Sequence, residues 1–209
     1  MDSPFNIFGV GFKQKGYLGI DIGTLSIKIV EFSNENGRPK LENYAILTNY
    51  GLALRNLAQD GAGKTPKVFD GEASSMLRRL VKAGEIKARE INMSVPIFSS
   101  FLTVMELPQM SESEVISAVQ FEAKKYVPVS LDSVIIDWSL IGTSAEGKIL
   151  ILLVAIPKDL VNEYTNIARE ADLKLLTIEL ETVSAARALI GNDPVPAVLM
   201  DVGSRDTTI

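Results

Sequence analysis

The sequence of 209 residues predicts an α/β fold, and three observations lead to this class. Short stretches rich in alternating β-branched residues, typical of strands, are separated by segments in which apolar residues recur at helical spacing. A strand-rich block at 101–157 interrupts this pattern and is typical of an insertion into a larger sheet. Two turns of the same design, at 21–28 and from 201 onward, each follow a hydrophobic stretch and contain Asp and Gly. Because 46% of its residues are hydrophobic, the chain can bury a substantial core.

The chain up to residue 99 is expected to form four strands and one helix. A Gly-Thr turn joins the first two strands, and the polar turn NENGRPK at 34–40 leads to the third. Residues 48–69 have little periodicity, which favours a surface connection. Apolar residues at helical spacing from Asp70 to Lys82 predict a helix that ends near Gly84. The four strands are expected at 17–22, 26–32, 41–47 and 91–96.

The block at 101–157 is expected to run strand, helix, strand, strand. Ser111 and Glu114 form a capping-box pattern, which predicts that a helix begins there. This helix is expected to run to about Tyr126 and to be stopped by Pro128. The three strands are expected at 101–108, 134–142 and 148–157.

After this block, helix and strand patterns alternate again. Pro157 and Asp159 begin a helix whose apolar stripe runs to Ala171. Another helix is expected from Val183 to Ile190. Strands are expected at 173–180 and at 197–203, the second of them buried and leading into the second Asp-Gly turn.

The composition excludes several classes of chemistry. The chain has no Cys and no His, which excludes thiol nucleophiles, disulfides, serine–histidine triads and ordinary zinc sites in this chain. Its net charge of −5 disfavours nucleic acid as a partner, because nucleic-acid binding needs an excess of Lys and Arg. The sequence has no apolar run of the roughly 18–20 residues that are needed to span a bilayer. We therefore expect a cytoplasmic protein.

The first 16 residues are expected to form a flexible arm. Their scattered apolar side chains, interrupted by Pro and Gly, do not make the continuous core of a signal peptide. Two interpretations stay open: a loosely ordered tail, or an arm that contacts a partner or lipid. The apolar side chains that would make this contact are Phe5, Ile7, Phe8 and Phe12.

The two Asp-Gly turns carry the residues that predict a phosphate site. Gly permits a tight turn and lets backbone N–H groups face outward, where together with hydroxyl groups they form a concavity suited to anionic oxygens. Aspartate repels phosphate, so its expected role is to hold Mg²⁺ through water. The first turn contributes Asp21, Gly23, Thr24, Ser26 and Lys28. The second turn contributes Asp201, Gly203, Ser204 and Thr207.

Simpler interpretations of the first turn stay open. Thr24 and Ser26 can satisfy the backbone of their own turn, and Lys28 can be an ordinary surface lysine of a strand.

The segment GAGKT at 61–65 looks like the end of a P-loop, but it lacks the context of one. Ala58 stands where the first Gly is needed, Pro66 follows directly, and no strand precedes the segment. We interpret it as a polar surface loop.

The pair of turns is similar to the two phosphate motifs of the actin-like ATPase superfamily. Three longer stretches resemble, more specifically, the PilM family of type IV pilus assembly proteins: GYLGIDIGTLSIKIVEF at the start, VQFEAKKYVPVSLDSVIIDWSLIG at 119–142 and IELETVSAARAL at 178–189. The resemblance covers about residues 16–209. It implies an actin-like (ribonuclease H-like) core with an inserted strand-helix-strand-strand (SHS2-like) subdomain. The implied divisions are a flexible arm at 1–16, the first part of the core at 17–99, the inserted subdomain at 100–170, and the return to the core with the start of a truncated second half at 171–209.

The resemblance also implies a function. PilM-like proteins are cytoplasmic, bind ATP with Mg²⁺, and are recruited to the inner membrane by the cytoplasmic N-terminal tail of PilN, a bitopic membrane protein. Links to the pilus platform and motor ATPases, self-association, and weak or absent ATPase activity are further implications. By family position, the residues of both turns contact phosphate, and Asp21 and Asp201 hold Mg²⁺ through water. Glu181 would lie near the metal-bound water, although it can equally be an ordinary acidic residue at a helix N-terminus. The resemblance assigns no catalytic residue.

Three other interpretations are weighed against this one. An FtsA-like cell-division protein and the cytoplasmic actin-like part of a type II secretion system share the expected core. A catalytic actin-like enzyme, such as a sugar kinase or an exopolyphosphatase, is disfavoured because no acidic cluster framed by Gly occurs between 100 and 180. PilM-like chains continue past the second phosphate turn, so we expect this chain to be incomplete at its C-terminus and to lack the adenine pocket.

Overall fold

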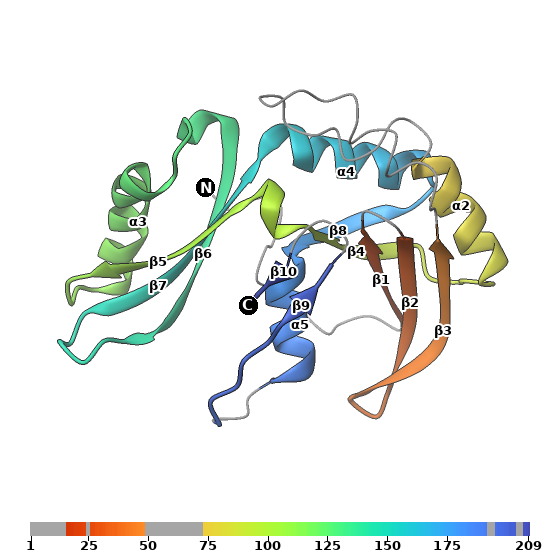
Figure 1. The fold of residues 1–209 in the computed structure, drawn as a ribbon, viewed down its shortest axis with the longest axis horizontal. Coiled ribbons are helices and arrows are strands. Elements are labelled where there is room, and N and C mark those ends of the chain that lie inside the picture. The colour runs from red at the N-terminus through yellow and green to blue at the C-terminus, as the bar shows by residue number, and fades with distance from the viewer. Residues whose placement is uncertain (1–15, 24–25, 49–72, 192–194, 204–206) are drawn as a thin grey trace.

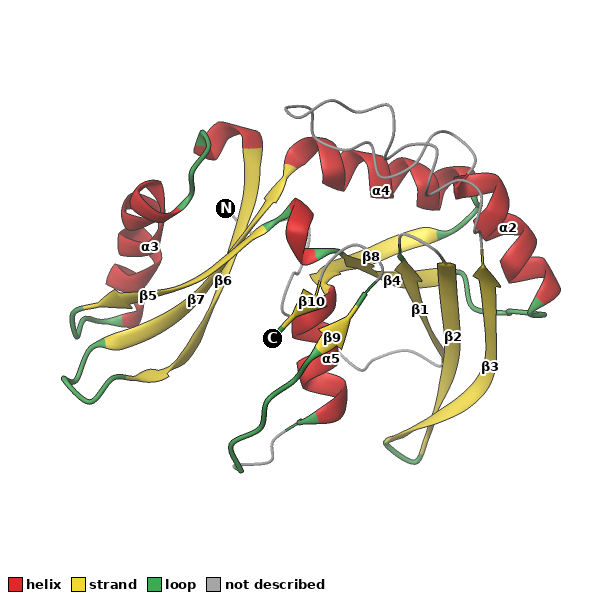
Figure 2. Ribbon diagram, in the orientation of Figure 1, coloured by secondary structure: helices red, strands yellow, loops and turns green. Residues whose placement is uncertain are grey.

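A computed structural model of the chain describes residues 16–23, 26–48, 73–191, 195–203 and 207–209. The described part contains a five-stranded sheet, a three-stranded sheet and a small two-stranded hairpin, with helices packed against the two larger sheets (Figures 1 and 2). Residues 1–15 of the expected N-terminal arm, the GAGKT segment, Thr24 and Ser204 lie outside the described residues, and Gly16 is the first residue of a strand.

The five-stranded sheet has the strand order β3-β2-β1-β4-β8. Its strands β1, β4 and β8 run parallel to one another, and β2 runs antiparallel to both of its neighbours. The strands are β1 (Gly16–Ile22), β2 (Ser26–Glu35), β3 (Arg38–Thr48), β4 (Glu90–Val95) and β8 (Lys174–Leu180), which confirms the five strands predicted in these regions.

Local sequence explains the β2–β3 hairpin. Asn36 and Gly37 both have positive φ angles, 54° and 82°, as a tight hairpin turn requires. The Gly37 N–H donates to Asn34 Oδ1 at 2.8 Å and fixes the turn. The polar turn predicted from NENGRPK is therefore confirmed.

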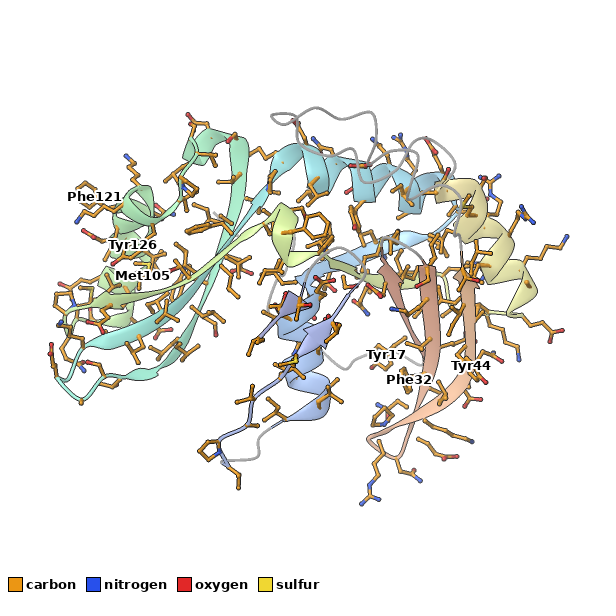
Figure 3. All side chains as sticks on the ribbon, viewed as in Figure 1. Tyr17, Phe32, Tyr44, Met105, Phe121 and Tyr126 are labelled. Atoms are coloured by element: carbon orange, nitrogen blue, oxygen red, sulfur yellow. The ribbon has the colours of Figure 1, made fainter. Side chains whose placement is uncertain are left out.

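The larger core lies on one face of this sheet. Alternate residues of β1, Leu18, Ile20 and Ile22, are at most 3% exposed and pack under α2 (Ala73–Ala83) and α4 (Lys158–Glu170). Helix α5 (Glu181–Leu189) lies on the opposite side, next to β8 (Figure 1). The corresponding face of β2 and β3 is open, and it exposes Tyr44, which Figure 3 shows together with Tyr17 and Phe32.

The inserted unit is a second sheet with its own core. Its strand order is β5-β7-β6 with antiparallel pairing, and α3 (Glu112–Tyr126) packs on one face. Met105 is fully buried in this core and Tyr126 packs against it, whereas Phe121 is exposed (Figure 3). The remaining elements are η1 (Ile97–Ser99), β5 (Phe101–Leu107), η2 (Leu131–Ser133), β6 (Val134–Thr143) and β7 (Ile149–Pro157).

The predicted strand-helix-strand-strand order is confirmed, and so is the capping box at the start of α3. The Ser111 N–H donates to Glu114 Oε2 at 2.8 Å, and the Glu114 N–H donates to the Ser111 carbonyl at 3.0 Å. The Ser111 hydroxyl, which donates to Glu114 Oε2 at 2.7 Å, and the Ser111 N–H hold the pKa of Glu114 below its usual value, because both favour the ionised carboxylate.

Strand β7 contributes to both cores. Ile151 and Leu153 belong to the core under α3, whereas Val154 and Ile156 belong to the larger core. Helix α4, which follows β7, also buries its apolar stripe in the larger core. The division of the chain into four segments remains a prediction; in this packing, the smaller core ends near residue 155.

The predicted strand at 197–203 is wrong over most of its length. Only β9 (Asp201–Val202) is strand, and among the described residues it pairs only with β10 (Thr207–Thr208). Val198 is 82% exposed and Val202 is 71% exposed. Apolar residues tend to be buried, but no described strand or helix covers the side chains of Val198 and Val202. None of the helices in the described ranges is long and apolar enough to cross a membrane.

Candidate functional site

The first Asp-Gly turn brings Asp21 and Lys28 together. Asp21 is the next-to-last residue of β1 and pairs across the hairpin with Lys28 of β2. Lys28 Nζ donates to Asp21 Oδ2 at 3.0 Å, and 52% of the Lys28 side chain and 36% of the Asp21 side chain are exposed. A carboxylate and an ammonium group therefore lie side by side, accessible to solvent, at the carboxyl end of β1.

Gly23 closes this turn. Its N–H donates to the Ser26 carbonyl at 2.9 Å, and a Cβ at position 23 would lie 3.3 Å from that same carbonyl oxygen. A larger residue would therefore press against the backbone. The Gly23 N–H is used within the turn and does not face outward, which differs from the expectation for a phosphate-binding amide.

Ser94, which the sequence analysis did not single out, completes the surroundings of Asp21. The side chain of Ser94 in β4 donates to Asp21 Oδ1 at 2.8 Å, and the two residues are partners in the parallel β1–β4 pairing. The next strand continues this line, because Ser94 pairs with Glu179 of β8. We call Lys28, Asp21, Ser94 and Glu179 the polar row.

Glu179, at the end of the polar row, is held by an arginine. It is 6% exposed, and its two carboxylate oxygens accept from Arg187 of α5 at 2.8 and 2.9 Å. Such a bidentate pair satisfies the buried carboxylate and fixes α5 against β8. Glu179 therefore has a structural role, and Asp21 is the accessible carboxylate of the polar row.

The donor set at Asp21 fits a hydrated magnesium ion. Mg²⁺ in nucleotide sites is usually held by one or two carboxylates, several waters and the phosphates themselves. Within the described ranges, no group of three or more His, Cys, Asp or Glu side chains can hold a metal on its own. An ion at this site would therefore depend on Asp21 together with water and phosphate oxygens.

Glu181 has a structural contact that the sequence analysis did not predict. It is the first residue of α5, and its Oε1 accepts from the Ile97 N–H at 3.1 Å. This hydrogen bond ties the start of α5 to η1, where the chain leaves the five-stranded sheet. Its expected place near a metal-bound water remains a prediction.

Tyr164 of α4 is fully buried near these carboxylates. Its hydroxyl has no hydrogen-bond partner among the described residues. Burial raises the pKa of this hydroxyl far above its usual value, and the negative charges of Glu163, Asp21 and Glu181 act in the same direction. The hydroxyl of Tyr164 therefore stays protonated near neutral pH.

The residues of the second turn lie on a separate hairpin near the C-terminus (Figure 1). Asp201 pairs with Thr208, Val202 pairs with Thr207, and Asp201, Gly203 and Thr207 are all exposed. Between the described residues of the two turns there is no hydrogen bond or ion pair. The shared phosphate cleft of the two turns therefore remains a prediction.

A hollow of the described surface lies elsewhere. It has a volume of about 520 Å³ and lies at the amino ends of β1 and β4, lined by residues that include Gly16, Glu31 and Lys87. The Glu31 carboxylate in its wall is 5% exposed and accepts from Asn43 Nδ2 and from the N–H groups of Lys87 and Ala88.

Glu31 is an example of a buried carboxylate that the fold satisfies completely. Burial raises the pKa of Glu31, but the hydrogen bonds from Asn43, Ala88 and Lys87 and the charge of Lys87 outweigh it and lower the pKa below its usual value. The group holds β2 to the connection that precedes β4, and its structural role accounts for its burial.

Comparison with known proteins agrees with the resemblance found in the sequence. The family model described as "Type IV pilus assembly protein PilM" matches residues 19–205. The chain is similar to a solved PilM–PilN type IV pilus biogenesis complex, with 21% sequence identity, a TM-score of 0.66, and coverage of 83% of this chain and 49% of that chain. This chain thus spans about half the length of that protein.

A more distant likeness is to the cytoplasmic domain of EpsL, an inner membrane component of the type II secretion system of Vibrio cholerae. Here the identity is 6% and the TM-score 0.51, with 79% of this chain and 57% of that chain covered. At these identities the two structures establish the fold alone, which confirms the predicted α/β class with its actin-like core. The family match extends over nearly the whole chain, and the chain belongs to the family of the type IV pilus assembly protein PilM.

Proposed function

We propose that the chain is the ATP-binding, actin-like component of a type IV pilus assembly complex, held at the inner membrane by the cytoplasmic N-terminal tail of a PilN protein. Membership of the PilM family over residues 19–205 is the observation that carries this proposal. The protein itself would remain on the cytoplasmic side, and the tail would supply its membrane attachment.

The geometry of the first turn supports nucleotide binding. Lys28 offers a positive charge to phosphate oxygens, and Asp21 offers a carboxylate to a hydrated Mg²⁺ at the same edge of the sheet. When bound, the ion would neutralise phosphate charge. Ser26 lies next to this pair, and the residues of the second turn, Asp201 and Thr207, would approach the phosphates from the other side.

The PilN tail is proposed as the partner from the likeness to a solved complex. The similar solved structure is a complex of PilM with PilN, at 21% identity to this chain. A short cytoplasmic tail can bind a folded protein in an extended form, as a strand or in a groove. Contacts with the pilus platform and motor ATPases, self-association, and little or no ATP turnover belong to the same proposal.

A role in type II secretion is not favoured by any specific observation. The likeness to EpsL is one of fold, at 6% identity, whereas the family match identifies the pilus protein.

Two binding measurements test the proposal. Titration calorimetry with a synthetic peptide of the cytoplasmic N-terminal tail of a PilN protein is expected to show saturable binding, and a scrambled peptide is expected to show none. Mg-ATP is expected to bind the same protein and to bind Asp21→Ala and Lys28→Ala more weakly, with both variants folded by circular dichroism. Absence of peptide binding would remove the partner, and unchanged affinity in both variants would remove the phosphate assignment.

A further inference from the structure

We propose that Ser94 is a positioning residue for the Asp21 carboxylate, which it holds ready for a divalent cation. This inference rests on the proposed nucleotide site and adds a residue to it from a strand that carries no phosphate motif. The observation behind it is a carboxylate held from both sides by neighbouring strands.

Each oxygen of the Asp21 carboxylate has its own donor. Ser94 Oγ of β4 donates to Oδ1 at 2.8 Å, and Lys28 Nζ of β2 donates to Oδ2 at 3.0 Å. Because β1 lies between β2 and β4, the two donors approach from opposite sides and determine the orientation of the carboxylate plane.

The two donors differ in how firmly the sheet holds them. Ser94 is a short side chain, and its neighbours Met93 and Val95 are at most 1% exposed, so its hydroxyl is fixed by the packed strand. Lys28 reaches Asp21 over a flexible four-carbon stem, and 52% of its side chain is exposed. Lys28 can therefore turn toward an incoming phosphate while Ser94 keeps its hold on Oδ1.

The two donors also differ in charge. The ammonium group of Lys28 competes electrostatically with a cation for Asp21, because both are positive. The hydroxyl of Ser94 orients the carboxylate without adding charge. Outer partners that orient a metal-binding carboxylate in this way commonly change metal affinity about 10–100-fold when they are removed.

A matched pair of substitutions isolates the hydroxyl. Ser94→Thr keeps the hydroxyl, and Ser94→Val has nearly the same shape as threonine but lacks it. Thr177→Val is the control, because Thr177 Oγ1 of β8 donates to Asn92 Oδ1 of β4, the strand of Ser94, at 2.7 Å without contacting Asp21. It removes a hydrogen bond of the same type from the same part of the sheet.

The measurement is the affinity of the whole chain for ATP, by titration calorimetry, over a series of Mg²⁺ concentrations and in EDTA. We expect Ser94→Val to raise the Mg²⁺ concentration for half-maximal effect about tenfold or more, and to leave the affinity in EDTA within about twofold of the unsubstituted protein. Ser94→Thr and Thr177→Val are expected to match the unsubstituted protein. A ligand-free crystal structure of Ser94→Val is expected to show the Asp21 carboxylate rotated.

Three results would overturn the inference. One is an equal Mg²⁺ dependence of Ser94→Val and Ser94→Thr, and another is an equal shift in Ser94→Val and Thr177→Val, which would indicate a general effect on the sheet. The third is that the unsubstituted protein binds ATP equally well with and without Mg²⁺. If the unsubstituted protein binds no ATP at all, both this inference and the proposed nucleotide function fail. If Ser94→Val does not fold, Ser94→Ala removes the same hydroxyl and takes its place in the comparison.

Discussion

The two Asp-Gly turns are alike in sequence and differ in everything that surrounds them. Asp21 ends the middle strand of a five-stranded sheet, with hydrogen-bond donors from the strands on both sides. Asp201 lies in a two-residue strand whose only described partner is an equally short strand. The comparison teaches that a local motif determines a turn, whereas distant strands decide whether its side chains are held for binding.

The largest expected difference is in stability. Ile22 beside Asp21 is 1% exposed, and Val202 beside Asp201 is 71% exposed. We expect Ile22→Ala to lower the free energy of unfolding by about 2–5 kcal/mol, because it opens a cavity in the core. Val202→Ala is expected to change the free energy of unfolding by no more than about 0.5 kcal/mol. Urea denaturation of the two variants measures both values, and similar losses would show that the second turn is packed after all.

The next comparison concerns magnesium-dependent nucleotide binding. Asp21→Asn keeps the shape of the side chain and removes its charge, so it is expected to weaken Mg-ATP binding about 10–100-fold. Asp201→Asn is expected to have the smaller effect, because among the described residues only the two-residue strand β10 pairs with the strand of Asp201. The affinities are measured by calorimetry with and without Mg²⁺. An equal loss of Mg-ATP affinity in the two variants would instead indicate that both turns contact one polyphosphate.

A third comparison uses the opposite end of β2 and a change of pH. Glu31→Gln is expected to lower the free energy of unfolding by about 1–3 kcal/mol near pH 7, since it replaces a buried carboxylate that accepts three hydrogen bonds. The folded-state pKa of Glu31 lies below the unfolded value, so its stabilisation is present above about pH 4.5.

This stabilisation is lost as the pH falls through the folded-state pKa of Glu31. The stability difference between the two proteins should therefore shrink in acid, as followed by denaturant unfolding at several pH values. A difference that stays constant between pH 7 and pH 3 would contradict the assignment.

The smallest expected effect is that of Lys28→Met on the ligand-free protein. The Lys28–Asp21 ion pair is largely exposed, and exposed pairs contribute about 0–1 kcal/mol. Thermal unfolding should therefore change little, whereas binding of Mg-ATP should weaken. A large loss of stability would mean that the ion pair supports the fold, and Lys28 would then be a structural residue of the hairpin.

The sequence predicted best those features that depend on neighbouring residues. The capping box of Ser111 and Glu114, the Asn36-Gly37 turn and the β1–β2 hairpin all form between residues close in the chain. Each is specified by local hydrogen bonds or by backbone angles that few residues adopt. The β1–β2 hairpin places Asp21 beside Lys28, and the phosphate site expected there stays a prediction.

The rest of the site depends on long-range pairing that no local pattern contains. Ser94 is 73 residues from Asp21, and only the parallel pairing of β1 with β4 brings them together. The hydrogen bond from the Ile97 N–H to Glu181 likewise joins residues 84 positions apart, and the expected place of Glu181 near a metal stays a prediction. The strand expected at 197–203 failed for a related reason, because apolar residues become buried only where another element covers them.

Strand β7 couples the two sheets, because its residues pack in both cores. Ile151 and Leu153 anchor it in the small core, and Val154 and Ile156 anchor the same backbone in the large one. Helix α4 begins directly after β7, so regular structure runs without a break from the small core into the large one. The two cores should therefore melt in a single transition, and two separate steps in a denaturant melt would contradict this.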